Sequence, residues 1–173
     1  DQRDCDISNH ALTLRPDGSA ACYSACLDAD PNITAAGFFT DPTGSIPVTL
    51  GDDDYAEVLL NEGATVSLYG ISYDRFYIGS NGYITFGNGD SEFYADLENH
   101  FALPRISALF ADLTPPDASC ISYKQLDDRV AITYQNIPLF GDKDTQKINP
   151  VFRCRFKDKS RNQKSSDGNS CVN

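Results

Sequence analysis

Four aspartates are the residues of this chain whose type and spacing best suit a chemical task. Asp52, Asp53 and Asp54 follow Gly51 directly, and Asp112 ends an apolar run further along the chain. Adjacent carboxylates repel one another, and sites rich in carboxylate oxygens suit Ca²⁺. The residue order does not match an EF-hand loop, and neighbouring side chains of an extended segment point to opposite sides. Two interpretations stay open, a calcium site and a solvated acidic turn.

The residue types that enzymes use are present without the patterns that catalysis requires. His10 and His100 are the only histidines, and no G-x-S-x-G segment supplies a serine nucleophile for either. Glu92, Asp96 and Glu98 are carboxylates of the kind that glycosidases pair. They lie together in one acidic loop, where acidic residues need no catalytic role. We therefore predict a protein without enzymatic activity, and a hydrolase is the third alternative.

Six cysteines in a chain without methionine or tryptophan favour an oxidising compartment. They are predicted to form three disulfides of open connectivity. Zinc is the competing interpretation, but no second closely spaced pair of cysteines or histidines completes a tetrahedral site. The candidate disulfide residues are Cys5, Cys22, Cys26, Cys120, Cys154 and Cys171.

The charge of −11 is unevenly distributed along the chain. Residues 142–173 carry a net charge of +4, and the residues before them carry −15. An acidic body repels phosphate, so nucleic acid is excluded as a partner. No apolar run reaches the ~18–20 residues that a membrane span needs. Asn32, in the sequon Asn32-Ile33-Thr34, is a candidate for N-glycosylation if the protein is secreted.

The elements that must position these residues are predicted to be strands. Phe76–Ile78 and Tyr83–Phe86 are aromatic and β-branched runs separated by Ser80-Asn81-Gly82, which predicts a central hairpin. Further strands or strand pairs are expected at 11–14 with 20–25, at 55–60, 65–69 and 106–110, and at 121–126 with 130–134. Only 92–100 suggests a helical turn. Strands every ~8–12 residues predict an all-β fold, an antiparallel β-sandwich of jelly-roll or Greek-key type.

The domain organisation follows from the change of composition near Asp144. Residues 1–144 are predicted to form the β-sandwich domain. Residues 145–173 are predicted to be a basic, cysteine-containing segment, with one edge strand at 151–156 and then poorly ordered chain. Cys154 and Cys171 are natural partners by proximity, so the tail is expected to be tethered by a disulfide.

The segments SNGYITFG and LPRISALFADL carry a family resemblance. Over residues 10–141 the chain resembles the nidogen-like group of extracellular β domains, and a domain of large secreted proteins from marine and planctomycete-type bacteria. The matching residues are Ser80, Asn81, Gly82, Tyr83, Ile84, Phe86 and Gly87, then Pro104, Ile106, Ala108, Phe110, Ala111 and Asp112. The resemblance implies a secreted or cell-surface, non-catalytic module of adhesion, matrix or surface assembly. It transfers no ligand residues.

The chain departs from this pattern after Asp144, where such domains continue into a further apolar strand pair. Here the sequence gives INPVFRCRFKDKSRNQKSSDGN instead. Either 151–156 is the last strand, or the C-terminal sequence is altered. A missing strand would leave an open sheet edge for strand addition by another copy.

The leading prediction is a structural or adhesion module that associates with itself, or with other extracellular proteins, through the open edge and its basic tail. The alternative is a carbohydrate-binding accessory domain that uses Ca²⁺ and exposed tyrosines such as Tyr69, Tyr73, Tyr77 and Tyr83. Calcium is the one candidate cofactor that the sequence suggests.

Overall fold

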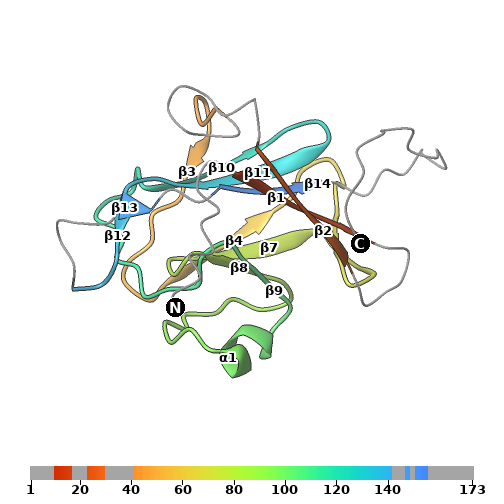
Figure 1. Cartoon of the computed structure of the whole chain (residues 1–173). Helices are drawn as coiled ribbons and strands as arrows, with labels where there is room; N and C mark the ends of the chain where they lie inside the picture. Colours follow the sequence, from red (N-terminus) through yellow and green to blue (C-terminus); the bar gives the residue numbers. More distant parts are fainter. Residues whose placement is uncertain (1–9, 17–22, 30–40, 142–146, 149–150, 156–173) are drawn as a thin grey trace. The chain divides into compact units, whose positions relative to one another are not determined.

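The computed structural model describes residues 10–16, 23–29, 41–141, 147–148 and 151–155 (Figure 1). The chain divides into two compact units, residues 1–41 with 158–173 and residues 42–157. The first unit contains the antiparallel hairpin β1 (His10–Pro16) and β2 (Tyr23–Ala29), with Leu12 opposite Leu27. The hairpin predicted near the N-terminus is confirmed. Among the described residues, no helix is long and apolar enough to cross a membrane.

The second unit is built of antiparallel strands with a single short helix among its described residues. One sheet has the order β14-β11-β10-β3 and the other has the order β4-β7-β8-β9. Their strands are β3 (Ile46–Pro47), β4 (Tyr55–Leu59), β7 (Arg75–Gly79), β8 (Tyr83–Thr85), β9 (Arg105–Ser107), β10 (Ile121–Gln125), β11 (Arg129–Tyr134) and β14 (Val151–Arg155). The chain therefore leaves the first sheet after β3, completes the second, and returns. The predicted all-β class is confirmed.

Three small elements complete the described part of this unit. The hairpin of β5 (Val66–Leu68) and β6 (Ile71–Tyr73) lies between β4 and β7 in the sequence. The pair of β12 (Ile137–Pro138) and β13 (Lys147–Ile148) follows β11. The helix α1 (Leu97–Phe101) begins after Asp96, whose carboxylate accepts a hydrogen bond from Asn99 N, and it overlaps the helical turn predicted at 92–100.

The two sheets face each other across an apolar core, which supports the predicted sandwich. Alternate residues of β7 and β8 point into this core, because successive side chains of a strand face opposite ways. Tyr134 of β11 is fully buried and donates its hydroxyl to Gly79 O and Tyr83 O of the opposite sheet, at 2.8 and 3.1 Å. The most deeply buried apolar residues are Phe76, Ile78, Ile84, Phe86, Leu113, Ile121, Val130, Ile132 and Ile137.

The strand expected at 106–110 is shorter than predicted and begins earlier. β9 ends at Ser107, because the chain then runs beside the β7–β8 turn and not along β8. Leu109 N donates to Gly82 O and Ala111 N donates to Asn81 O, both at 3.3 Å. The apolar residues after Ser107 therefore pack against a turn.

The strand predicted at 151–156 is confirmed as β14, which pairs with β11 within the chain from Thr133↔Val151 to Arg129↔Arg155. This edge of the sheet is therefore formed by the chain's own segment. The edge beyond β14 has no paired strand among the described residues.

Cys120 and Cys154 are buried free thiols in the structure. Cys120 lies beside Gln135 and Cys154 lies opposite Val130. Five residues of β11 separate those positions, about 16 Å at the strand rise, so the two thiols cannot reach each other. Cys5, Cys22 and Cys171, the side chain of Cys26, and the sequon at Asn32 lie outside the described residues.

Candidate functional site

Three of the four aspartates predicted to bind calcium lie together in the structure. Asp52 and Asp53 lie in the turn before β4, and Asp112 lies in the segment after β9. One carboxylate oxygen from each lies within 4.8 Å of the others. We call these three residues the acidic cluster. Residues distant in sequence thus converge on one site because the segment after β9 runs back toward the turn before β4.

Asp54 belongs to the turn and not to the acidic cluster. Its Oδ2 accepts a hydrogen bond from Gly51 N at 3.2 Å, and its Oδ1 accepts one from Tyr55 N at 2.8 Å. Its backbone is fixed by Ser80, whose hydroxyl accepts from Asp54 N. Asp54 therefore closes the turn that presents its two neighbours. This is the solvated-turn role that the sequence left open for the whole run.

Backbone geometry and hydrogen bonds fix the positions of the Asp52 and Asp53 carboxylates. Asp53 has a φ of 49°, in the left-handed region that aspartate tolerates better than most residues. Its Oδ1 accepts a hydrogen bond from Asn81 Nδ2 at 2.9 Å. Asp52 Oδ1 accepts one from Thr114 Oγ1 at 3.3 Å. The segment that carries Asp112 is held from the other side, where Asp112 O accepts from Phe140 N.

Asn81, in the β7–β8 turn, is the buried residue that connects the cluster to its surroundings. Its Nδ2 donates to Asp53 Oδ1 and to Glu92 O, and its Oδ1 accepts from Leu113 N at 2.8 Å. The side chain is fully buried. All of its polar atoms are therefore satisfied by three different segments, as a buried amide requires.

The electrostatics of the cluster favour a bound cation. Partial burial raises the pKa of Asp112, and the nearby charges of Asp53 and Asp52 raise it further. Like charges held together disfavour ionisation, and a cation removes that repulsion. The donors are all oxygen atoms, with no nitrogen or sulfur ligand among the three residues. This donor set fits a hard cation such as Ca²⁺.

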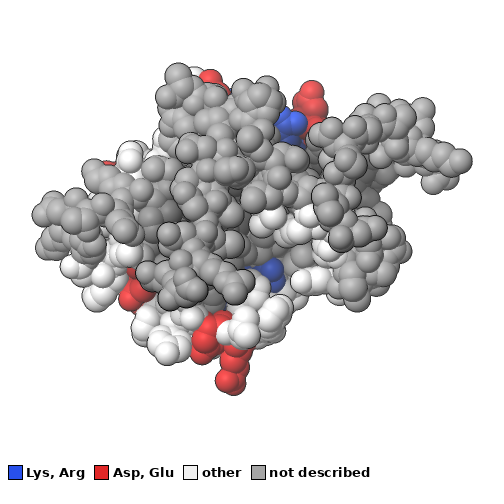
Figure 2. All heavy atoms as spheres, viewed as in Figure 1, with Lys and Arg blue, Asp and Glu red and all other residues white. Residues whose placement is uncertain are grey.

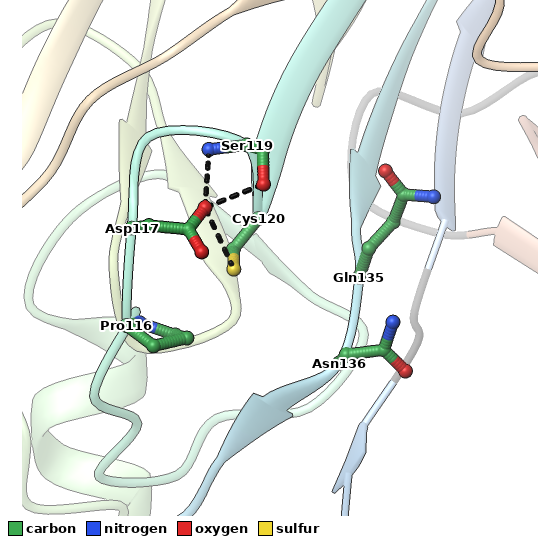
Figure 3. Close-up of a pocket in the computed structure, with 6 residues that line it drawn as sticks. All are labelled: Pro116, Asp117, Ser119, Cys120, Gln135 and Asn136. Carbon is green, nitrogen blue, oxygen red and sulfur yellow. Dashed lines mark hydrogen bonds between the residues drawn. The ribbon is translucent and has the colours of Figure 1, made fainter.

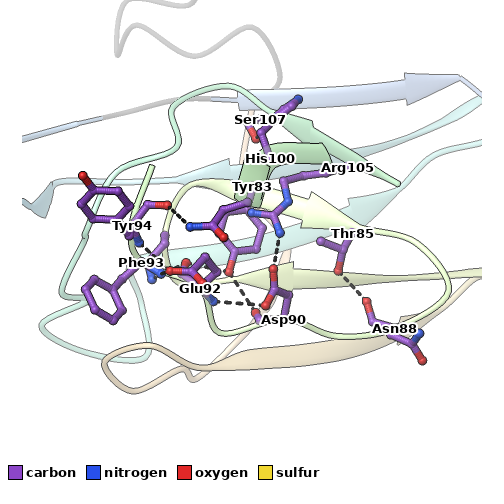
Figure 4. Close-up of polar contacts among 12 residues, drawn as sticks. Tyr83, Thr85, Asn88, Asp90, Glu92, Phe93, Tyr94, His100, Arg105 and Ser107 are labelled. Atoms are coloured by element: carbon purple, nitrogen blue, oxygen red, sulfur yellow. Dashed lines mark hydrogen bonds and ion pairs between the residues drawn. The ribbon is translucent and has the colours of Figure 1, made fainter. Parts of the chain in front are cut away.

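A second polar network lies on the outer face of β8 and β9 (Figure 4). The strap, defined as residues 88–101, crosses this face and is held through its backbone. Tyr83 Oη donates to Asp90 O and Glu92 O at 3.0 and 2.9 Å. Thr85 Oγ1 donates to Asn88 O at 2.7 Å. The strap is therefore positioned by side chains of the sheet beneath it.

Arg105 is the charged residue at the centre of this network. Its side chain has no exposed surface and forms an ion pair with Asp90 of the strap. Its guanidinium carbon lies 4.2 Å from the ring centre of Tyr83 and 4.7 Å from that of Phe110. Nε and Nη1 have no hydrogen-bond partner. The stacking of the guanidinium on the two rings stands in for those hydrogen bonds.

Three of the residues weighed for catalysis, Glu92, Asp96 and His100, make local structural contacts. Glu92 Oε1 accepts from Phe93 N and Tyr94 N, and Asp96 caps α1. His100 Nδ1 lies 3.2 Å from Ser107 Oγ, and burial together with the charge of Arg105 lowers the His100 pKa. The side chain of His10 lies outside the described residues.

The predicted set of outward-facing tyrosines is only partly correct. Tyr69 is exposed, but Tyr83 is fully buried beneath the strap. The exposed aromatic residues of the strap, Phe93, Tyr94 and Phe101, were not predicted. Their signal in the sequence is weak: they are apolar residues in an acidic loop without strand or helix periodicity.

A surface hollow of about 390 Å³ lies at the start of β10 (Figure 3). Cys120 Sγ in this hollow donates to Asp117 Oδ1 at 3.6 Å. Burial raises the Cys120 pKa, so the thiol stays protonated and is a poor nucleophile. The hollow is lined by Pro116, Asp117, Ser119, Cys120, Gln135 and Asn136, which include no histidine or lysine to activate the thiol.

The comparisons with known proteins bear on the β7–β9 region and its surroundings. No significant match to a curated protein or to a solved structure was found. A family model described as NIDO related matches residues 32–127, more than half of the chain. That range includes the acidic cluster, the central hairpin and the strap. The chain belongs to the nidogen-related family.

Proposed function

We propose that this protein is a non-catalytic extracellular structural module, of the adhesion or matrix-assembly type, whose fold is reinforced by Ca²⁺. The observation that carries the proposal is the convergence of Asp52, Asp53 and Asp112, with carboxylate oxygens within 4.8 Å of one another. The nidogen-related family supports the extracellular structural role. Burial raises the pKa of the Cys120 and Cys154 thiols, which keeps both protonated and makes them poor nucleophiles.

The role of the cation follows from the segments that it would join. The acidic cluster contains the turn before β4 and the segment after β9, and Asn81 links both to the β7–β8 turn. Without a cation, three carboxylates repel one another where these segments meet. A cation that binds only the folded chain stabilises it by mass action. Calcium would therefore hold together loops at one end of the sandwich.

Removal of calcium is expected to lower the melting temperature, and Asp112→Asn is expected to abolish the effect. Calcium at a hundred times its dissociation constant stabilises the fold by about 2.7 kcal/mol. Differential scanning calorimetry with Ca²⁺, with Mg²⁺ and with a chelator measures the shift. Asp127→Asn, in the exposed β10–β11 turn, is the matched control and should retain it. An identical melting temperature with Ca²⁺ and with chelator would refute the calcium site.

The pH dependence of stability gives a second measurement on the same cluster. The Asp112 pKa is raised in the folded chain above its ordinary value of 3.8. The folded state therefore holds this proton more tightly than the unfolded state. The resulting stabilisation is complete below pH 3.8 and is lost as the pH rises through the raised pKa.

In chelator, the wild type should therefore become less stable relative to Asp112→Asn as the pH rises from about 4 to 7. Addition of calcium should reverse the order at neutral pH. Urea denaturation of both proteins across this range measures the difference. A difference that is flat with pH, or that widens toward acid, contradicts the assignment.

A further inference from the structure

The strap presents a patch of large apolar side chains to solvent. Phe93, Tyr94, Leu97 and Phe101 are 48%, 64%, 76% and 69% exposed, and α1 has no buried residue. Single exposed apolar residues are ordinary, but four within residues 93–101 form a cluster that marks an interaction surface. We call these four side chains the strap patch.

The strap patch is held on a fixed backbone. Asn99 Nδ2 donates to Tyr94 O at 2.9 Å, which ties the two aromatic residues to α1. Leu97 and Phe101 are four residues apart and so lie on one face of the helix. In Figure 4, Phe93 and Tyr94 point away from Tyr83 and Arg105, which anchor the strap. A surface ordered before binding loses less entropy when a partner docks.

The charges around the strap patch are acidic. Glu92, Asp96 and Glu98 flank the apolar side chains, and none of them has an ion pair with a described Lys or Arg. Arg105 is buried beneath the strap and is paired with Asp90. The described surface in Figure 2 shows Asp and Glu beside uncharged residues at the lower end, where Figure 1 places α1. The partner that fits is therefore basic and carries apolar side chains.

We propose that the strap patch docks the basic segment 156–164 of a second copy of this chain. That segment, FKDKSRNQK, contains four Lys or Arg residues, one Asp and Phe156. It is complementary in charge to the strap and supplies an apolar side chain for the strap patch. The contact joins two different surfaces, so repetition builds a ring or an open chain of copies. The inference rests on the proposed structural role, because such a chain of copies is a form of surface assembly.

The test is the association of the full-length chain, measured by sedimentation velocity over a wide concentration range. Association at low salt is expected, and it should weaken at high salt because exposed charges are screened. The triple variant Phe93→Ser/Leu97→Ser/Phe101→Ser should weaken it at least about thirtyfold, the effect of losing one strong interface anchor. The exposed positions of these residues leave the core intact, and thermal melting checks this.

Two further variants make the test specific. Leu59→Ser removes an equally exposed apolar residue outside the strap and should leave association unchanged. Glu98→Lys should weaken association, and combination with Lys159→Glu should recover it in part.

A full-length chain that stays monomeric at low salt would overturn the proposal, as would a triple variant that associates like the wild type. Binding of the monomeric chain to a glycan array or to an unrelated basic peptide, if lost in the triple variant, would assign the strap patch to that ligand instead. The calcium-dependent shift in melting temperature is a separate measurement. If a protein that does not associate still shows this shift, the docking proposal is refuted and the proposed calcium site is not.

Discussion

Gly82→Ala is expected to destabilise the second unit by more than about 4 kcal/mol, the range reserved for severe steric disruption. Gly82 has a φ of 77°, and a Cβ at this position would overlap Leu109 O and lie 3.3 Å from Leu113 Cδ1. The overlap is with backbone, which cannot rotate away. The segment displaced by the new methyl group also carries Asp112, so calcium binding should be lost with stability.

The matched control for this prediction is Gly87→Ala. Gly87 has a φ of 86°, but nothing lies within 4 Å of an added Cβ. Only the conformational cost remains, about 1–2 kcal/mol. Urea denaturation of both variants separates the two effects. Equal destabilisation at the two glycines would show that the contact with Leu109 is unimportant.

Arg105→Ala is the second large effect, with an expected loss of about 3–5 kcal/mol, the cost of breaking a buried ion pair. The substitution leaves Asp90 without its cation and removes the stacking on Tyr83 and Phe110. Release of the strap should follow, because Asp90 is one of its fixed points. Hydrogen exchange of the strap amides, together with urea denaturation, measures both consequences.

An exposed ion pair provides the control for Arg105. Arg75 pairs with Glu57 at 2.7 Å, but both side chains are about half exposed. Arg75→Ala should change stability little, since solvent screens such pairs. Arg105→Met combined with Asp90→Asn should recover part of the loss, because it leaves no buried charge unpaired. A double variant as unstable as Arg105→Ala would place the main effect in the stacking.

The elements that could be predicted from the sequence are those whose signal is local. The hairpin around Asn81-Gly82 and the strand at 151–156 follow from strand composition and turn residues alone. Three of the four aspartates singled out in the sequence lie in the acidic cluster. Asp54 lies outside the cluster because adjacent side chains point in different directions. Its carboxylate instead accepts hydrogen bonds from the backbone of its own turn.

The features that could not be predicted depend on the packing of segments distant in sequence. Nothing near Arg105 in the sequence shows that a strand arginine will lie against two aromatic rings under a strap. The end of β9 depends on contacts of Leu109 and Ala111 with the β7–β8 turn. Disulfide pairing could not be predicted either, since proximity in sequence does not place two thiols on adjoining strands; Cys120 and Cys154 are free thiols in the structure.

The way in which the strap is held has a consequence for how its surface can vary. Asn81, Tyr83 and Thr85 all donate to carbonyl oxygens of the strap, which every amino acid possesses. The hydrogen bonds from β8 and the β7–β8 turn therefore require no particular side chains in the strap. Asp90, which pairs with Arg105, is the exception. The outward residues can be exchanged while the loop keeps its course, so this part of the fold is a natural acceptor for grafted recognition sequences.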